Sequence, residues 1–298
     1  MTATNLPFRP PFTTAPMLGA LAAHAVGGLE RHDVESGTHT RVVPAPYGPA
    51  VVSVRFAGTD HVEADIRAAH SDDVPHVAAL VRRWLDLDAD PDVVDAALAR
   101  HTLLAPHVAA RPGLRVLGSV DGFETAVLTV LGQQVSLSAA RTFGSRFVAA
   151  FGTPTAFDGF VSFPEPESLA ALDPAIIQKA VGLTGARART VQALAAAASD
   201  GLHLGPGADP VEFRTRLLAL PGIGPWTVDY LSVRVLGDRD AYPSGDLVLR
   251  RALGVKTPRE AAAASEPWRP WRAYALFPPV DEPGLPVTPP RRLPRQRA

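Results

Sequence analysis

Leu220-Pro-Gly-Ile-Gly-Pro-Trp226 is the stretch that decides the fold of this chain of 298 residues. It separates two amphipathic segments, Val211–Ala219 and Trp226–Leu236, and therefore predicts a turn between two helices. Glycine permits φ > 0 and lets a ligand approach the backbone closely. The N–H groups of Gly222 and Gly224 would then lie at the positive end of the second helix, where a DNA phosphate can bind. A plain turn between packed helices is the alternative interpretation.

A single carboxylate comes after the second predicted helix. Asp246 lies beyond the loop-like segment Tyr242–Gly245 and directly before Leu247-Val-Leu-Arg-Arg251, so it is expected to start a further helix. The commonest role of an aspartate in that position is to cap the helix. The alternative is catalysis, because a phosphate-binding turn followed by a lone acid suggests carboxylate chemistry on DNA.

The regions around this stretch predict two domains and a tail. Residues 1–92 mix strand and helix patterns and predict a small α+β domain with an antiparallel sheet. Residues 93–277 are almost entirely helical in pattern, and 278–298 hold seven prolines and four arginines. We expect this Pro/Arg-rich tail to be disordered, either merely solvated or binding phosphates nonspecifically. The expected elements are strands at Thr38–Val43 and Ala50–Phe56, and helices at Met17–Leu29, Val74–Leu87, Phe123–Leu131 and Ser138–Phe151.

Two aspartate–proline pairs predict helix starts in the helical part. Asp173-Pro174 and Asp209-Pro210 each place a capping acid before a proline at the first helical position. Glu212 lies three residues after Asp209, which is the spacing of a capping box.

Composition excludes several classes of chemistry. The chain has no cysteine, which removes disulfides, thiol nucleophiles and thiolate metal sites, and its nine histidines form no metal-binding motif. No apolar stretch is long enough to span a membrane, and no signal-peptide pattern is present, so we expect a cytoplasmic, nucleoid-associated monomer. The net charge is −1, but residues 231–298 carry 12 positive against 7 negative side chains, which favours a local DNA contact.

The run LLALPGIGPWTVDYLSVRVLGDRDAYPSGDLVLRRAL resembles the helix–hairpin–helix DNA glycosylases, and Trp226 points to the AlkA-type 3-methyladenine DNA glycosylases II. Further segments resemble that family in the same order, so the resemblance covers roughly residues 6–277. It implies a small N-terminal domain followed by a helix–hairpin–helix glycosylase core. The further segments are Met17–Val26, Ala110–Arg115, Val120–Glu124, Leu131–Ser136 and Trp268–Ala275.

The resemblance also assigns roles to residues. Asp246 matches the catalytic aspartate, and Trp226 and Tyr230 match aromatic residues of the base pocket, although core packing is their local alternative. Gln134 matches the wedge that fills the gap left by a flipped base, and Thr227 is expected to add a phosphate contact. The DNA-binding hairpin is Gly222, Ile223 and Gly224, and a monovalent cation is implied at the backbone oxygens of Leu218, Leu220 and Ile223. No cofactor is implied.

The family's activity would be hydrolysis of the bond between sugar and alkylated base in double-stranded DNA. Related glycosylase/lyases use a lysine at the Trp226 position, and neither Lys179 nor Lys256 matches it. Base removal without strand cleavage is therefore predicted. One departure supports an alternative: Phe277 is followed by Pro278-Pro279 where the family continues a helix with a pocket tryptophan, so a catalytically impaired DNA-binding protein is the second interpretation. Ala20 also replaces a pocket aromatic of some relatives.

Overall fold

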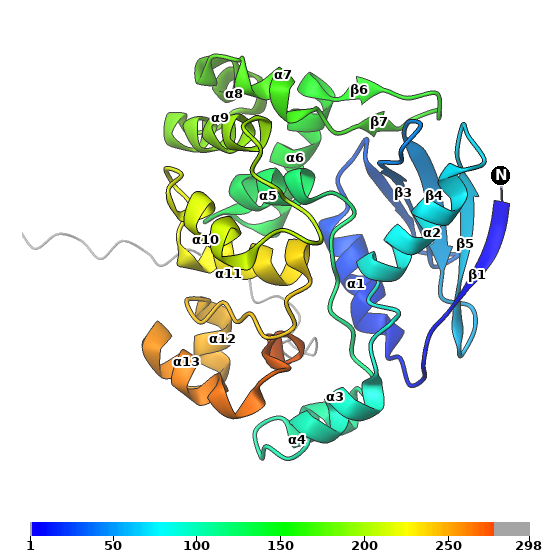
Figure 1. Cartoon of the computed structure of the whole chain (residues 1–298), viewed down its shortest axis with the longest axis vertical. Coiled ribbons are helices and arrows are strands. Elements are labelled where there is room, and N and C mark those ends of the chain that lie inside the picture. The colour runs from blue at the N-terminus through cyan, green and yellow to red at the C-terminus, as the bar shows by residue number, and fades with distance from the viewer. Residues whose placement is uncertain (1, 277–298) are drawn as a thin grey trace, which may run out of the picture.

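A computed structural model describes residues 2–276 of the chain (Figure 1). A sheet with two helices forms one side of the molecule, and a group of helices forms the other. Two helices that follow the sheet in sequence, α3 (Pro91–Leu98) and α4 (Ala105–Ala110), lie near the last two helices, α12 (Leu247–Ala252) and α13 (Pro258–Ser265). Within this described part of the chain, no helix is long and apolar enough to span a membrane. The predicted tail, 278–298, and Phe277 lie outside the described residues.

The N-terminal sheet is antiparallel and has five strands in the order β1-β5-β4-β3-β2. The predicted strand pair is confirmed: Val43 faces Ala50, and Thr38 faces Arg55. Three further strands were not predicted. The strands are β1 (Thr2–Pro7), β2 (Glu30–Asp33), β3 (Thr38–Val43), β4 (Ala50–Arg55) and β5 (His61–Arg67), and helices α1 (Thr14–His24) and α2 (Asp73–Trp84) accompany them.

The helix predicted at Met17–Leu29 is shorter than expected. It ends at His24, and the chain then turns so that the N–H of Glu30 reaches the carbonyl of Val26 at 2.9 Å. Ala25, with a ψ of 124°, ends the helical geometry, and Gly28 has a φ of +92° in the turn that follows. Glu30 consequently starts strand β2, which the helical spacing of the preceding apolar residues had concealed.

The helical side is built around α5 (Gly122–Gly132), whose buried residues join a core with Phe147, Phe213 and Leu231. The helix predicted over Trp226–Leu236 is α-helical only to Leu231 and continues as a π-helical turn, Ser232–Leu236. The other elements are α6 (Leu137–Phe151), β6 (Thr153–Pro154), β7 (Val161–Ser162), α7 (Pro166–Ala170), α8 (Pro174–Val181), α9 (Gly185–Ser199), α10 (Pro210–Leu218), α11 (Pro225–Leu231), and 3-10 turns at Glu266–Trp268 and Arg272–Leu276.

Both predicted aspartate caps are confirmed. The carboxylate of Asp173 accepts the N–H of Ala175, and that of Asp209 accepts the N–H groups of Val211 and Glu212. Glu212, however, pairs with Arg216 one turn later, so the predicted capping box at α10 is formed only by its aspartate half. A complete capping box occurs instead at Thr257 and Glu260.

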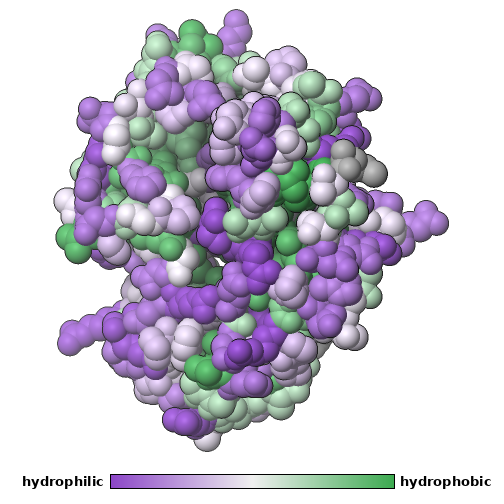
Figure 2. Space-filling view, turned by 45° about the vertical axis from the view of Figure 1, so that its right-hand side comes forward, coloured by the Kyte–Doolittle hydropathy of each residue, from purple (hydrophilic) through white to green (hydrophobic). Residues whose placement is uncertain are grey.

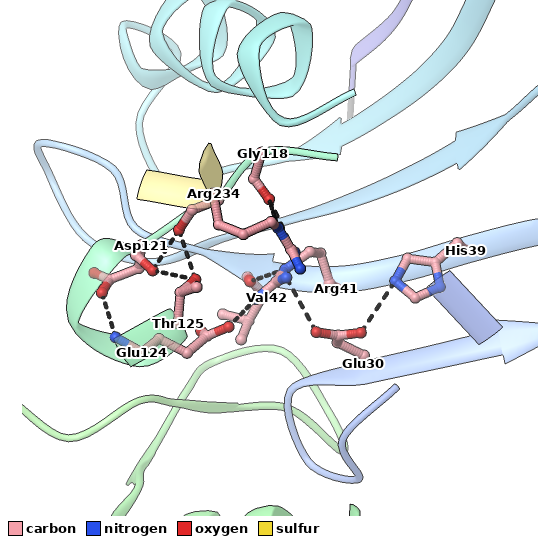
Figure 3. A network of polar contacts seen from close by, with 10 residues as sticks. Glu30, His39, Arg41, Val42, Gly118, Asp121, Glu124, Thr125 and Arg234 are labelled. Atoms are coloured by element: carbon pink, nitrogen blue, oxygen red, sulfur yellow. Dashed lines mark hydrogen bonds and ion pairs between the residues drawn. The ribbon is translucent and has the colours of Figure 1, made fainter. Parts of the chain in front are cut away.

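A buried ionic network joins the sheet to the helical side (Figure 3). Arg41 of β3 is only 5% exposed, and its guanidinium contacts Glu124 of α5 at 2.7 Å and Glu30 of β2 at 3.0 Å. The other oxygen of Glu30 lies 3.3 Å from the imidazole of His39. Burial raises the pKa of Glu124 to about 7, and the neighbouring charge of Arg41 limits that rise. The two domains are therefore held together by charges that neither could leave unpaired at low cost.

Candidate active site

The turn between α10 and α11 is docked on the protein through its first glycine. Gly222 has a φ of +80°, and a Cβ added there would lie 2.3 Å from the hydroxyl oxygen of Thr190. Ile223 is buried in the helical core, and its N–H donates to the carbonyl of Leu220 at 3.3 Å. Gly222 is thus required by the fold, and Ile223 offers neither its side chain nor its N–H outward.

Gly224, the second glycine of the turn, borders open space. Gly224 caps α11 without any side-chain hydrogen bond, and a Cβ added there would meet nothing within 4 Å. The first N–H groups of a helix have no partner within the helix, so an uncapped start leaves them available to a ligand. Of the predicted hairpin, Gly224 and the start of α11 are therefore the part that is open to a ligand.

Three backbone oxygens of the same turn belong to the implied cation site. The oxygen of Leu220 already accepts the N–H of Ile223, but a carbonyl has a second lone pair. Leu218, Leu220 and Ile223 thus fit a monovalent cation as far as donor chemistry goes. This site stays a prediction.

Asp246 caps a helix, which is the first of the two roles that its sequence position left open, and it also contacts Trp226. Its Oδ1 caps α12 by accepting the N–H groups of Val248 at 2.8 Å and Leu249 at 3.1 Å. Its Oδ2 accepts the indole N–H of Trp226 at 3.0 Å. The carboxylate is therefore held at three points, and it is only half-buried. Beside it, Tyr242 is buried, and burial followed by the charge of Asp246 raises the pKa of its phenol to about 12.

Trp226 and Tyr230 form one aromatic wall. Their rings stack with centroids 5.5 Å apart and planes 12° from parallel, and both side chains are partly exposed. At this distance the two rings are in direct contact, so a flat ligand would pack on the outside of the pair rather than between the rings. Tyr230 packs against the helical core as well, so the wall has one side on the core and keeps part of its surface open.

Gln134 lies in the turn between α5 and α6 and is exposed, with a φ of +55°. A non-glycine residue in this conformation is uncommon and draws attention to the loop. Its neighbour Gln133, which the sequence did not single out, ties this loop to the hairpin. The amide nitrogen of Gln133 donates to the carbonyl of Gly222 at 3.3 Å and to the hydroxyl of Thr227 at 3.0 Å.

The expectation for Thr227 needs correction. Its side chain is only 3% exposed, and its hydroxyl accepts the hydrogen bond from Gln133. A phosphate contact through this hydroxyl does not fit that geometry, because the atom lies inside the junction between the two turns. Thr227 positions the Gln133–Gln134 loop instead. The spacing on the sequence could not show this, because the two partners are 94 residues apart.

The surface between the upper and lower parts of the molecule is hollowed (Figure 2). Apolar atoms line its floor and polar residues surround it.

Comparisons with known proteins agree with this arrangement. Residues 3–121 match the AlkA N-terminal domain, and residues 127–269 match the HhH-GPD superfamily base excision DNA repair protein family. A probable bifunctional transcriptional activator/DNA repair enzyme AlkA of Mycobacterium tuberculosis is 42% identical over 91% of this chain, which spans 55% of that relative's length. DNA-3-methyladenine glycosylase 2 of Escherichia coli is 32% identical over 92% of this chain and 95% of its own length.

Among solved structures, a 3-methyladenine DNA glycosylase of Archaeoglobus fulgidus superposes with a TM-score of 0.77 at 17% identity, covering 93% of this chain and 96% of that one. That likeness shows the fold. The family matches give the class, a helix–hairpin–helix base-excision repair protein with an N-terminal sheet domain. The sequence relatives narrow the class: the chain belongs to the AlkA-type DNA-3-methyladenine glycosylase family.

Proposed function

We propose that this protein is a monofunctional DNA glycosylase that hydrolyses the N-glycosidic bond of alkylated bases, such as 3-methyladenine and 7-methylguanine, in base excision repair. The observation that carries the proposal is the contact between Asp246 and Trp226, which places a fixed carboxylate beside an exposed aromatic wall. The similarity to DNA-3-methyladenine glycosylases of Escherichia coli and Bacillus subtilis supports the substrate class.

Asp246 is suited to the chemistry of that bond. As the bond to the base breaks, positive charge develops on the sugar, and a preorganised anion stabilises it. Water then attacks the anomeric carbon and loses its proton to the carboxylate, while the bonding electrons leave with the base. Because the three contacts fix Asp246 in advance, its reorganisation during the reaction costs little. A purine methylated at N3 or N7 is already cationic and needs little acid assistance to leave.

The remaining residues serve the grip on DNA and the exposure of the base. The uncapped start of α11 at Gly224 supplies N–H groups for a phosphate, and such contacts position the protein without reading sequence. The target nucleotide must leave the helix to reach Asp246. Gln134 is exposed on a loop fixed by Gln133 and is suited to occupy the vacated space. Trp226 and Tyr230 then offer the flipped cationic base a cation–π contact. The partner is double-stranded DNA containing an alkylated base, bound by a monomer.

Hydrolysis without strand cleavage follows from the residue at the Trp226 position. A lyase step needs an amine to form a Schiff base with the sugar. Both lysines of the chain are exposed elsewhere, Lys179 on α8 and Lys256 in the loop after α12, and the position next to Asp246 carries an indole.

The test is release of free base from DNA containing 3-methyladenine or 7-methylguanine. We expect release by the wild type and no borohydride-trapped covalent complex. DNA binding without release of any alkylated base would instead support the catalytically impaired alternative, and a trapped complex would overturn the absence of a lyase step.

A further inference from the structure

Arg234 lies in the π-helical turn that follows α11, one turn beyond Tyr230. One guanidinium nitrogen donates to the phenol oxygen of Tyr230 at 2.5 Å, and two others donate to the backbone oxygen of Gly118 at 3.1 Å and 3.3 Å. Figure 3 shows the side chain directed at Gly118. Short π-helical segments inside helices occur frequently at functional sites. The side chain therefore connects the aromatic wall to a segment outside the helical core.

Gly118 is itself fixed to the N-terminal domain. Its N–H donates to the carbonyl of Trp84, at the end of α2, at 2.8 Å. A Cβ added at Gly118 would lie 2.8 Å from the carbonyl oxygen of Arg83, so only glycine fits there without a shift. A continuous series of contacts thus runs from α2 through Gly118 and Arg234 to Tyr230, and from there through Trp226 to Asp246.

The charge of Arg234 is not neutralised by an ion pair among residues 2–276. Its guanidinium carbon lies 5.5 Å from the centroid of the Tyr230 ring, which is already within the range of a cation–π contact. The same charge also acts on His24, the last residue of α1. Burial first, and then the charge of Arg234, lower the pKa of the His24 imidazole. A positive field therefore acts on the tyrosine end of the wall before any substrate arrives.

We propose that Arg234 is a positioning residue for the base pocket and that its charge lowers the preference for cationic over neutral damaged bases. This inference rests on the proposed glycosylase function. Positioning follows from the fork of hydrogen bonds, which holds the Tyr230 ring against Trp226 for every substrate. Selectivity follows from charge, because the guanidinium repels a methylated, cationic base and competes for the Tyr230 ring, whereas a neutral base such as hypoxanthine meets neither penalty.

Two substitutions separate these effects. Arg234→Lys keeps the charge but loses the planar fork, so it cannot serve both Tyr230 and Gly118 in the same geometry. Arg234→Gln keeps a donor but removes the charge. Base release is measured as kcat/KM on 7-methylguanine DNA and on hypoxanthine DNA. We expect R234K to lower both rates by a similar factor. We expect R234Q to lower hypoxanthine release more, so that the ratio of 7-methylguanine to hypoxanthine release rises by about three- to tenfold.

Tyr230→Phe is the matched control, since it keeps the ring and removes the oxygen that Arg234 holds. In the Y230F background, the loss caused by R234K should be smaller than in the wild type, because the positioning contact is already absent. Thermal unfolding of each variant shows whether a loss of rate reflects unfolded protein. An unchanged ratio in R234Q overturns the charge effect, and full activity of folded R234K overturns the positioning role.

Two readouts do not depend on turnover. An NMR titration of His24 should show a higher imidazole pKa in R234Q than in the wild type, because a positive neighbour is removed. Tryptophan fluorescence quenching should show that R234Q gains affinity for the cationic nucleoside 7-methylguanosine relative to neutral inosine. A wild type that releases neither base overturns the proposed function alone, whereas an unchanged His24 titration and unchanged nucleoside preference overturn the role of the Arg234 charge.

Discussion

The turn between α8 and α9 and the turn between α10 and α11 have nearly the same backbone plan. Each begins with a glycine of positive φ, +83° at Gly182 and +80° at Gly222. Each continues with a buried apolar residue, Leu183 or Ile223, and a further residue that caps the next helix. The same helical core therefore contains two turns of similar backbone conformation.

The two turns differ at the capping residue. The hydroxyl of Thr184 accepts the N–H of Arg187 and closes the start of α9, whereas Gly224 has no side chain with which to close α11. A self-capped helix satisfies its own N–H groups, and an uncapped one leaves them for a ligand. The proposed DNA binding of the second turn therefore depends on the absence of a capping side chain at Gly224.

The largest expected effect comes from a substitution that sharply lowers base release without abolishing DNA binding. Asp246→Asn keeps an oxygen for the N–H groups of Val248 and Leu249 but removes the charge, so base release should fall by about 10²–10³-fold while DNA binding persists. The matched control is Asp209→Asn, since Asp209 caps α10 in the same way without an indole partner. Single-turnover base release and DNA-binding anisotropy measure the two properties. Equal activity of D246N and wild type would remove Asp246 from the mechanism.

The next effect concerns helix α5, which packs against both α9 and α11 and therefore supports both turns. This helix carries Glu124. The pKa of Glu124 is raised to about 7 from 4.5, so between these pH values the folded protein holds a proton that the unfolded chain has released. Stability should therefore fall as pH rises from 4.5 through 7, by up to about 3 kcal/mol. Urea unfolding from pH 5 to 8 measures this loss. Glu124→Gln should flatten it, and an identical pH slope in both proteins would show that another group titrates.

The glycines that begin the two turns should differ in their tolerance of alanine. Both substitutions place a Cβ at positive φ, which costs about 1 kcal/mol. At Gly222 the new Cβ also meets the Thr190 hydroxyl at 2.3 Å, whereas at Gly182 it meets only the flexible end of Arg146 at 3.2 Å. We expect Gly222→Ala to lose about 2–3 kcal/mol of unfolding free energy and Gly182→Ala about 1 kcal/mol. Equal losses would mean that Thr190 yields freely.

The smallest effect is expected when the capping residues of the two turns, Gly224 and Thr184, are exchanged. Gly224→Ser should supply the missing side chain, since nothing lies within 4 Å of its Cβ and the extended backbone there suits any residue. We expect DNA binding to weaken by about five- to tenfold, near 1 kcal/mol, with unfolding free energy unchanged or slightly higher. The reciprocal Thr184→Gly should cost a few tenths of a kcal/mol in stability and leave DNA binding unchanged. Unaltered DNA affinity of G224S would show that the N–H groups at the start of α11 do not bind phosphate.

Local patterns in the sequence predicted the features that depend on near neighbours. The hairpin, the strand pair β3–β4 and the aspartate caps at Asp173 and Asp209 are set by residues close by in the chain, and the structure confirms them. Strand β1 escaped prediction because its partner, β5, lies about 60 residues further along the chain. The end of α1 was misplaced because apolar spacing continued past the turn at Gly28.

The candidate site likewise contains residues that the sequence predicted and residues that it did not. The positions of Asp246, Trp226 and Tyr230 could be read from one segment, together with a family resemblance, and the structure brings them together. Gln133 and Arg234 could not be found in this manner, because their partners Thr227 and Gly118 are 94 and 116 residues away. The phosphate contact expected of the Thr227 side chain did not fit either, because a resemblance within one segment does not show that Gln133 of a distant loop covers its hydroxyl.

The buried Arg41 has a consequence for any attempt to produce the two parts of the protein separately. The two family matches end and begin at residues 121 and 127, which suggests two modules that could be produced separately. A cut there would strip Arg41 of the Glu124 carboxylate and would expose Val42 and Val51, which pack with Val148 and Phe160 across the boundary. Each fragment would then present a charge or an apolar face made for the other. The boundary between the two family matches is therefore not a place where the folded protein can be divided without loss.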